Sequence, residues 1–193
     1  MTIRDRMPRT TCDCDGCQIG CRCLPGMAGI GDIERIADHG EQEFRKLFGD
    51  NEFNREQWIA CRFVASEGAK VGRLNDRGGI DVFQIPTITP AQRPNGECVF
   101  YDNGRCSIHA VSPIGCSHVD PHMTKEEGDA VVHPALAEIA ADGQADGPYW
   151  RLWQHLKSLG LVARPLAERR AAFQRLFAAC WIQPRKRPES LSA

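Results

Sequence analysis

Cysteine is distributed very unevenly along this chain, and that distribution limits what the chain can fold into. Eight of the ten cysteines lie in two clusters, one of five within twelve residues and one of three within nineteen. The clustered residues are Cys12, Cys14, Cys17, Cys21, Cys23, Cys98, Cys106 and Cys116. Ten cysteines among 193 residues are fewer than a disulfide scaffold carries. The pattern therefore favours metal binding or thiol chemistry over a fold held by disulfides.

The compartment decides how these cysteines are interpreted. Residues 1–14 are polar and lack the apolar core of a secretion signal. No apolar stretch approaches the ~20 residues that a membrane-spanning helix needs. We therefore expect a cytoplasmic protein with no membrane partner. Thiols are kept reduced in the cytoplasm, where clustered cysteines more often bind metal than form disulfides.

Size and charge narrow the function classes further. The chain has 193 residues, of which 42% are hydrophobic, enough for one domain with a real core and marginal for two. A net charge of −1 gives no basic face of the kind that nucleic-acid-binding domains usually have, so we expect no nucleic-acid partner. We find no phosphate-binding loop, Ser–His–Asp set or pair of catalytic carboxylates, and whether the chain is an enzyme stays open.

The first cluster contains a CxxC motif, Cys14-Asp15-Gly16-Cys17, followed by Cys21-Arg22-Cys23. Glycine within the motif allows a tight turn that aims two sulfurs at one ion. Short-spaced thiolate pairs on glycine-containing loops are a common way to assemble zinc and iron–sulfur sites. The alternative is a disulfide-bonded loop, which a reducing compartment disfavours.

The second cluster is spread more widely along the chain. Cys98 and Cys106 flank the turn 102–104, and Cys116 follows Pro113-Ile114-Gly115. Thiolates delivered from turns leave backbone N–H groups free to hydrogen-bond the sulfurs, which tunes a metal site. The alternative is that each of these cysteines packs as a small buried hydrophobe.

In the order and spacing of these motifs, residues 12–116 resemble the YkgJ-type cysteine-cluster family, described as a zinc- or iron-chelating domain. The family pattern has an N-terminal CxxCxxCC-like cluster, a helix after it and a later C…C.IY..RP..C motif. The segment from Cys98 to Cys116 matches the later motif, except that Ser112 stands where the family has an arginine. Arg22 splits the paired cysteines of the first motif, which leaves open which N-terminal cysteines are ligands, Cys12 among them.

The clusters and the resemblance together imply a metal-binding protein that holds an iron–sulfur cluster or zinc, in two four-thiolate sites or in one site with spare thiols. An iron–sulfur cluster suits electron transfer or sensing, and structural zinc suits an adaptor or interaction domain. A third alternative is a metal-dependent enzyme or maturation accessory, which rests only on analogy with family members fused to flagellin-lysine methylation proteins. A site closed by four thiolates counts against it, because a catalytic zinc keeps an open position.

Three histidines and the two remaining cysteines are further candidates for metal ligands. His109, His118 and His122 lie near the second cluster, and each can supply an imidazole ligand, although a hydrogen-bonding or surface role is the simpler interpretation. Cys61 and Cys180 lie in apolar, helix-like sequence and are predicted to pack in the core.

We predict a mostly helical fold with an irregular cysteine-rich layer and a small β-hairpin, in a single metal-stabilised domain. Residues 12–122 are its metal-binding region and 123–181 its C-terminal helical part, with tails at 1–11 and 182–193. Helices are predicted at 32–48 with Asp32 as N-cap, at 55–65, after a Thr124–Glu127 capping box, at 149–159 and at 166–181. The remaining predictions are irregular structure at 1–31, turns at 68–79, a strand at 80–85, a stiff proline linker at 86–94 and a hairpin around the turn 102–104.

Overall fold

The computed structural model describes residue 7 and residues 9–10 and 15–180, and about half of the structure is helical. In chain order the elements are α1 (Asp15–Cys23), α2 (Asp32–Phe48), α3 (Arg55–Ala60), β1 (Phe63–Leu74), β2 (Ile80–Pro90), β3 (Tyr101–Asp102), β4 (Arg105–Cys106), the 3₁₀ turn η2 (His109–Val111), α4 (Ile114–Ser117), α5 (Lys125–Gln144), α6 (Pro148–Ser158) and α7 (Leu166–Cys180). The result is a mixed α/β domain rather than a mostly helical one.

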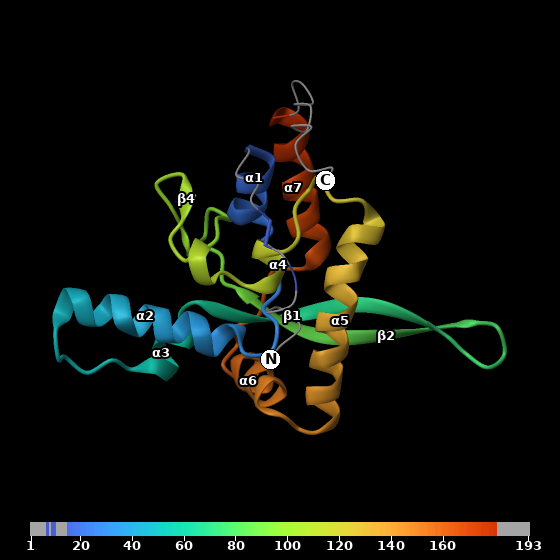
Figure 1. Cartoon of the computed structure of the whole chain (residues 1–193), viewed down its shortest axis with the longest axis horizontal. Helices are drawn as coiled ribbons and strands as arrows, with labels where there is room; N and C mark the ends of the chain where they lie inside the picture. The colour runs from blue at the N-terminus through green and yellow to red at the C-terminus, as the bar shows by residue number, and fades with distance from the viewer. Residues whose placement is uncertain (1–6, 8, 11–14, 181–193) are drawn as a thin grey trace.

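β1 and β2 form a long antiparallel ribbon that runs through the molecule and projects from it on one side, whereas α2 projects on the other (Figure 1). The register runs from Phe63 opposite Pro90 to Leu74 opposite Ile80, with a shift between Ser66 and Ala69. The distal half of the ribbon exposes apolar side chains on its surface, which are Leu74, Ile80, Val82 and Phe83. Only the proximal half therefore contributes to the core.

The proximal half of the ribbon lies at the centre of that core. Phe63 and Ile88 are fully buried, and both edges of the ribbon are covered here. Ala28 forms a bridge with Ile88 on one edge, and Val162 forms a bridge with Ala65 on the other. The core also contains Ile33, Ile36, Cys98, Phe100, Ile108, Ile139, Tyr149 and Leu156.

A buried tyrosine fixes the segment between α1 and α2 against the ribbon. The Tyr149 hydroxyl, from the first turn of α6, donates a hydrogen bond to the Ala28 carbonyl at 2.8 Å and accepts one from the Ile88 N–H at 2.7 Å. Both partners are backbone groups, so the bonds hold the chain itself and not only side chains. Tyr149 thereby fixes the position of the chain around Ala28, which lies close to the cysteines described below.

Several sequence predictions are confirmed. α2 begins at Asp32 and ends before Gly49, although Gly31 is its N-cap and Asp32 is the first helical residue, so the N-cap prediction is wrong. The capping box is present, because the Thr124 side chain accepts from the Glu127 N–H and the Glu127 carboxylate accepts from the Thr124 N–H. α6 and α7 match their predicted ranges within one residue for the part of the chain described.

The prediction that residues 1–31 are irregular is wrong for residues 15–23, which form α1. This helix contains Gly16 and Gly20, each of which costs a helix about 1 kcal/mol relative to alanine. Ile19 and Cys23 are buried four residues apart, on one face of the helix. Burial of that face outweighs the cost of the two glycines. The helical pattern was missed in the sequence because it rests on only two buried positions within a run of cysteines.

The predictions for residues 55–90 are partly wrong. The predicted helix at 55–65 ends at Ala60, and the predicted turns at 68–79 are mostly strand β1. Pro86 and Pro90 belong to β2 and not to a linker. Pro86 lies opposite the register shift, a kind of irregularity at which a strand tolerates a residue without an N–H. Pro90 is the last residue of β2.

The small hairpin is confirmed. β3 and β4 pair through Tyr101 opposite Cys106, and the turn residues Asn103 and Gly104 have φ of 48° and 83°, as a two-residue hairpin turn requires. Among the described residues, none of the helices combines the length and the apolar character needed to cross a membrane.

Candidate metal centre

Four cysteines from the two sequence clusters line a single small cavity. They are Cys21, Cys98, Cys106 and Cys116. The rest of the lining is apolar or aromatic and consists of Pro25, Pro90, Phe100, Tyr101, Ile108 and Pro113. The volume of the cavity is about 10 Å³, which is close to the least space that can hold one water molecule.

The end of α1 is bound directly to the segment that carries Cys98, which explains how the two clusters meet. The Cys98 N–H donates to the Arg22 carbonyl at 2.8 Å, and the Gln92 amide donates to the Cys23 carbonyl at 2.9 Å. The Arg22 guanidinium also pairs with Glu97 at 2.9 Å. These contacts place Cys21, one helical position before Arg22, on the same side of the molecule as Cys98.

The other two cavity cysteines come from short elements. Cys106 is positioned by the β3–β4 hairpin, where it pairs with Tyr101. Cys116 lies in α4, a helix of four residues. The predicted hairpin setting of Cys106 is confirmed. The predicted turn before Cys116 is wrong, because Ile114 and Gly115 already belong to the short helix that contains Cys116.

Backbone contacts aim the Cys116 sulfur. The Gly26 N–H lies 3.1 Å from Cys116 Sγ and donates to it. A backbone hydrogen bond to sulfur was expected, but it comes from another segment of the chain and not from the residues next to Cys116. The approach is close, because a Cβ on Gly26 would lie 2.1 Å from the carbonyl carbon of Gly115. The Gly115 N–H in turn donates to the Met27 carbonyl at 3.0 Å. Glycine at both positions lets the two backbones touch.

The surroundings keep the four thiols protonated in the metal-free chain. Burial is the largest cause and raises the pKa of Cys21 to about 11 and that of Cys98 to about 12. The pKa values of Cys106 and Cys116 are also raised, again chiefly by burial. The thiolates of Cys21, Cys98 and Cys106 further raise the pKa of Cys116, which means that these sulfurs lie close enough to repel one another as anions.

The cavity is not arranged as a finished coordination site. Among the residues that the structure describes, no three His, Cys, Asp or Glu side chains are placed so that they could hold a metal ion. The structure therefore brings four predicted ligands around one cavity without placing them in a coordination geometry.

Two other predicted ligands of the first cluster, Cys17 and Cys23, are not part of the cavity lining. Cys23 is buried and donates its S–H to the Ile19 carbonyl at 3.2 Å, as a thiol packed within a helix does. Cys17 is half-buried and is not part of the lining. Cys12 and Cys14 lie outside the described residues.

The two cysteines assigned to the core give different results. Cys61 is exposed, so its core prediction is wrong, because α3 ends at Ala60 and leaves Cys61 beyond the helix. Cys180 ends α7, and its side chain lies outside the described part.

The histidines near the second cluster do not line the cavity. His109 and His122 are exposed. His118 is buried, and its Nδ1 lies 2.7 Å from the Ser117 hydroxyl. All three agree with the hydrogen-bonding or surface interpretation better than with a ligand role.

Sequence reasoning missed one residue that bears on the site. Asp32 is 1% exposed, and its carboxylate accepts hydrogen bonds from backbone N–H groups of two segments that meet at Cys116. The signal in the sequence was an acidic residue at the start of a helix, which usually indicates a solvent-exposed cap.

Comparison with known proteins adds no relative. No protein family, curated protein or solved structure matches this chain. The resemblance to the YkgJ-type family thus stays a prediction.

Proposed function

We propose that this chain is a metal-binding protein whose site is formed by the thiolates of Cys21, Cys98, Cys106 and Cys116. The observation that carries the proposal is the convergence of these four residues on one cavity. Three come from the second sequence cluster and one from the first, so the cavity joins parts of the chain that are far apart in sequence. Four cysteines are the usual ligand set of structural zinc and of mononuclear or clustered iron.

The four thiols can ionise to thiolates only when a cation is bound beside them. Among the described residues that line the cavity, none is a lysine, arginine or histidine, and burial holds the thiols in their neutral form. A bound metal supplies the positive charge that lets a buried thiol lose its proton.

The size of the cavity favours a single ion over a multi-iron cluster. A volume of about 10 Å³ has room for about one atom of the size of water oxygen. Zinc and single iron both accept four thiolates. Zinc would give the structural role of an adaptor or interaction domain, and iron would give a role in electron transfer or sensing. Four thiolates leave no open position, which counts against a metal-dependent enzyme.

Elemental analysis of the full chain, purified without oxygen, tests the proposal. We expect about one zinc or iron per chain, the amount that one four-thiolate site holds. Colourless protein with zinc supports the structural role, and coloured protein with one iron supports the redox role. Four irons per chain would replace the single ion by a cluster. A reduced chain that retains no metal and takes up neither zinc nor ferrous iron would refute the proposed function.

A further inference from the structure

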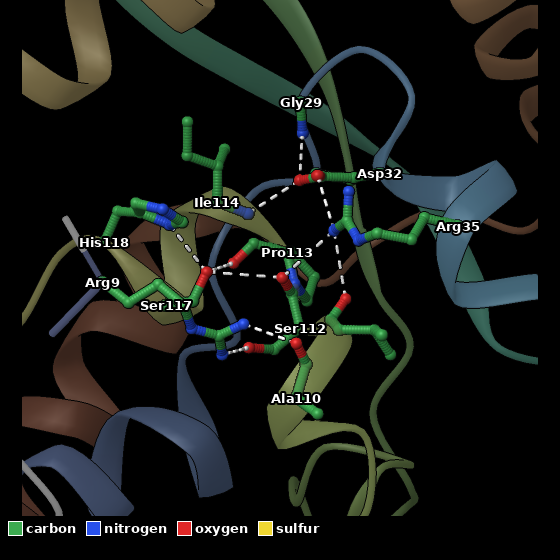
Figure 2. A network of polar contacts seen from close by, with 12 residues as sticks. Arg9, Gly29, Asp32, Arg35, Ala110, Ser112, Pro113, Ile114, Ser117 and His118 are labelled. Atoms are coloured by element: carbon green, nitrogen blue, oxygen red, sulfur yellow. Dashed lines mark hydrogen bonds and ion pairs between the residues drawn. The ribbon is translucent and has the colours of Figure 1, made fainter. Parts of the chain in front are cut away.

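Asp32 is the buried carboxylate of a polar network that joins α2 to the segment around Cys116 (Figure 2). Its Oδ2 accepts a hydrogen bond from the Gly29 N–H at 2.8 Å and another from the Ile114 N–H at 2.7 Å. Its Oδ1 accepts from the Arg35 guanidinium at 2.8 Å. A buried carboxylate with this many partners is costly to assemble and strongly destabilising to break.

Arg35 extends the same network to the chain before Cys116. Its Nη2 donates to the Val111 carbonyl at 3.1 Å, in addition to Asp32. Arg35 is partly exposed, whereas Asp32 is not. The pair therefore fixes both ends of the stretch from Val111 to Ile114, which leads directly into α4.

The two segments held by Asp32 are the two that meet at the Cys116 sulfur. Gly29 follows Gly26, whose N–H donates to Cys116 Sγ at 3.1 Å. Ile114 precedes Cys116 by two residues in α4. A single carboxylate oxygen thus binds both the N–H donor segment and the sulfur-bearing helix, in addition to the direct hydrogen bond between Gly115 and Met27.

We propose that Asp32, with Arg35, is a positioning residue for Cys116 in the metal site, an inference that rests on the proposed function. Asp32 is not part of the cavity lining. It acts through Gly29 and Ile114, so that the Cys116 thiolate is presented to the ion together with Cys21, Cys98 and Cys106. The contacts described above for these other three ligands do not involve Asp32.

An amide cannot replace this carboxylate. If the amide oxygen of the Asp32→Asn side chain took the place of Oδ2, its NH₂ group would face the Arg35 guanidinium, and two donors would oppose each other. If the amide were turned over, its NH₂ would face the Gly29 and Ile114 N–H groups instead. Asp32→Asn therefore breaks one part of the network in either orientation while it preserves the shape of the side chain.

Cobalt(II) titration of the reduced full-length chain tests this role, because the intensity of thiolate-to-cobalt charge-transfer absorption reports the number of sulfur ligands. We expect Asp32→Asn, at saturating cobalt, to lose about a quarter of this absorption, the share of one ligand in four. In the cobalt-loaded variant, Cys116 should also become open to alkylation while the other three cavity cysteines stay protected. General loss of stability would move neither readout in a chain that circular dichroism shows to be folded.

Asp38→Asn is the matched control, since Asp38 lies on the same helix, is exposed and pairs with Arg55. It should give the absorption of the parent chain. Absorption and alkylation of Asp32→Asn equal to those of the parent would overturn the positioning role, whereas a parent chain without thiolate–cobalt bands would refute the proposed function itself. Should Asp32→Asn not fold, Arg35→Met makes the same test. That variant removes the ties to Val111 and Ser112 and leaves the Asp32 carboxylate buried without its cation. Parent-like absorption in it would overturn the pairing of Asp32 with Arg35 on which the positioning role rests.

Discussion

The cysteines of this chain differ less in sequence than in what surrounds each sulfur. Cys116 receives a backbone hydrogen bond and shares a cavity with three other thiols. Cys23 donates within its own helix, and Cys61 is in contact with solvent. Their sequence neighbours did not distinguish these situations. Burial and convergence, which depend on residues far along the chain, decide which sulfur can be a ligand.

Cys116→Ser should therefore lose bound metal, whereas Cys61→Ser should keep it. Serine replaces a soft thiolate by a hard, protonated oxygen, which is a poor ligand for zinc or iron. It also leaves a hydroxyl among apolar groups, at a cost of about 1–3 kcal/mol if it finds no partner. Metal per chain and melting temperature of both variants give the answer. Parent-like metal content in Cys116→Ser would show that this cysteine is not a ligand.

The pKa shifts predict how pH acts on the metal-free chain. Burial raises the pKa of the Cys98 thiol from 9.0 to about 12, so above pH 9 the unfolded chain loses this proton while the folded chain keeps it. The unfolded state then binds fewer protons, and stability falls as pH rises, by about 1.4 kcal/mol per pH unit for one such thiol. The fall should extend from pH 9 toward the raised pKa.

Urea unfolding of chelator-treated protein across this pH range measures the effect. The Cys98→Ala chain is the control, and its unfolding free energy should fall less steeply with pH than that of the parent. Equal slopes in the two chains would mean that the Cys98 thiol is not protected from ionisation by the fold.

The elements that the sequence predicts well are those whose signals are local. The capping box at Thr124, the hairpin turn at Asn103-Gly104 and the amphipathic stripe of α2 each depend on residues within a few positions of one another. β1 and β2 were partly missed, since their pairing depends on partners up to 27 positions apart, from Phe63 to Pro90. The glycines at 68, 72, 78 and 79 predicted turns, but those at 68 and 72 lie within β1 and only those at 78 and 79 lie between the strands.

Two glycines near the site should respond in opposite ways to alanine. A Cβ on Gly26 would lie 2.1 Å from a backbone carbon of Gly115, so Gly26→Ala has to separate the two segments and weaken the hydrogen bond to Cys116. A Cβ on Gly20, inside α1, meets nothing within 4 Å. Gly20→Ala should stabilise the chain by about 0.5–1 kcal/mol, the helix preference for alanine over glycine.

Denaturant unfolding and metal content of the two alanine variants check this pair. Gly26→Ala should lose both stability and metal, and Gly20→Ala should keep its metal. A Gly26→Ala chain as stable as the parent would contradict the close backbone contact.

At the scale of the whole molecule, the sequence predicted which cysteines are candidate ligands but not which of them meet around one cavity. The sequence named all four cavity cysteines among eight candidates, and the motif from Cys98 to Cys116 carried the specific part of the resemblance. It could not select Cys21 from its neighbours, because that choice depends on the helix α1 and its bonds to the segment before Cys98. Nor could it show Asp32, whose role exists only once two distant segments meet.

The region around the cavity contains little regular structure, and this leads to a last prediction. β3, β4, η2 and α4 are two to four residues long each, so no long helix or strand holds Cys106 and Cys116 in place. An ion that binds only the folded chain adds stability by mass action, about 4 kcal/mol at a thousandfold excess over its Kd. For a chain of this size that raises the melting temperature by roughly 8–16 °C. Thermal melts of the metal-loaded chain with and without a strong chelator measure the difference, and Cys116→Ser, which should respond less to the chelator, is the control. An unchanged melting temperature after verified removal of the metal would mean that the site does not contribute to the stability of the fold.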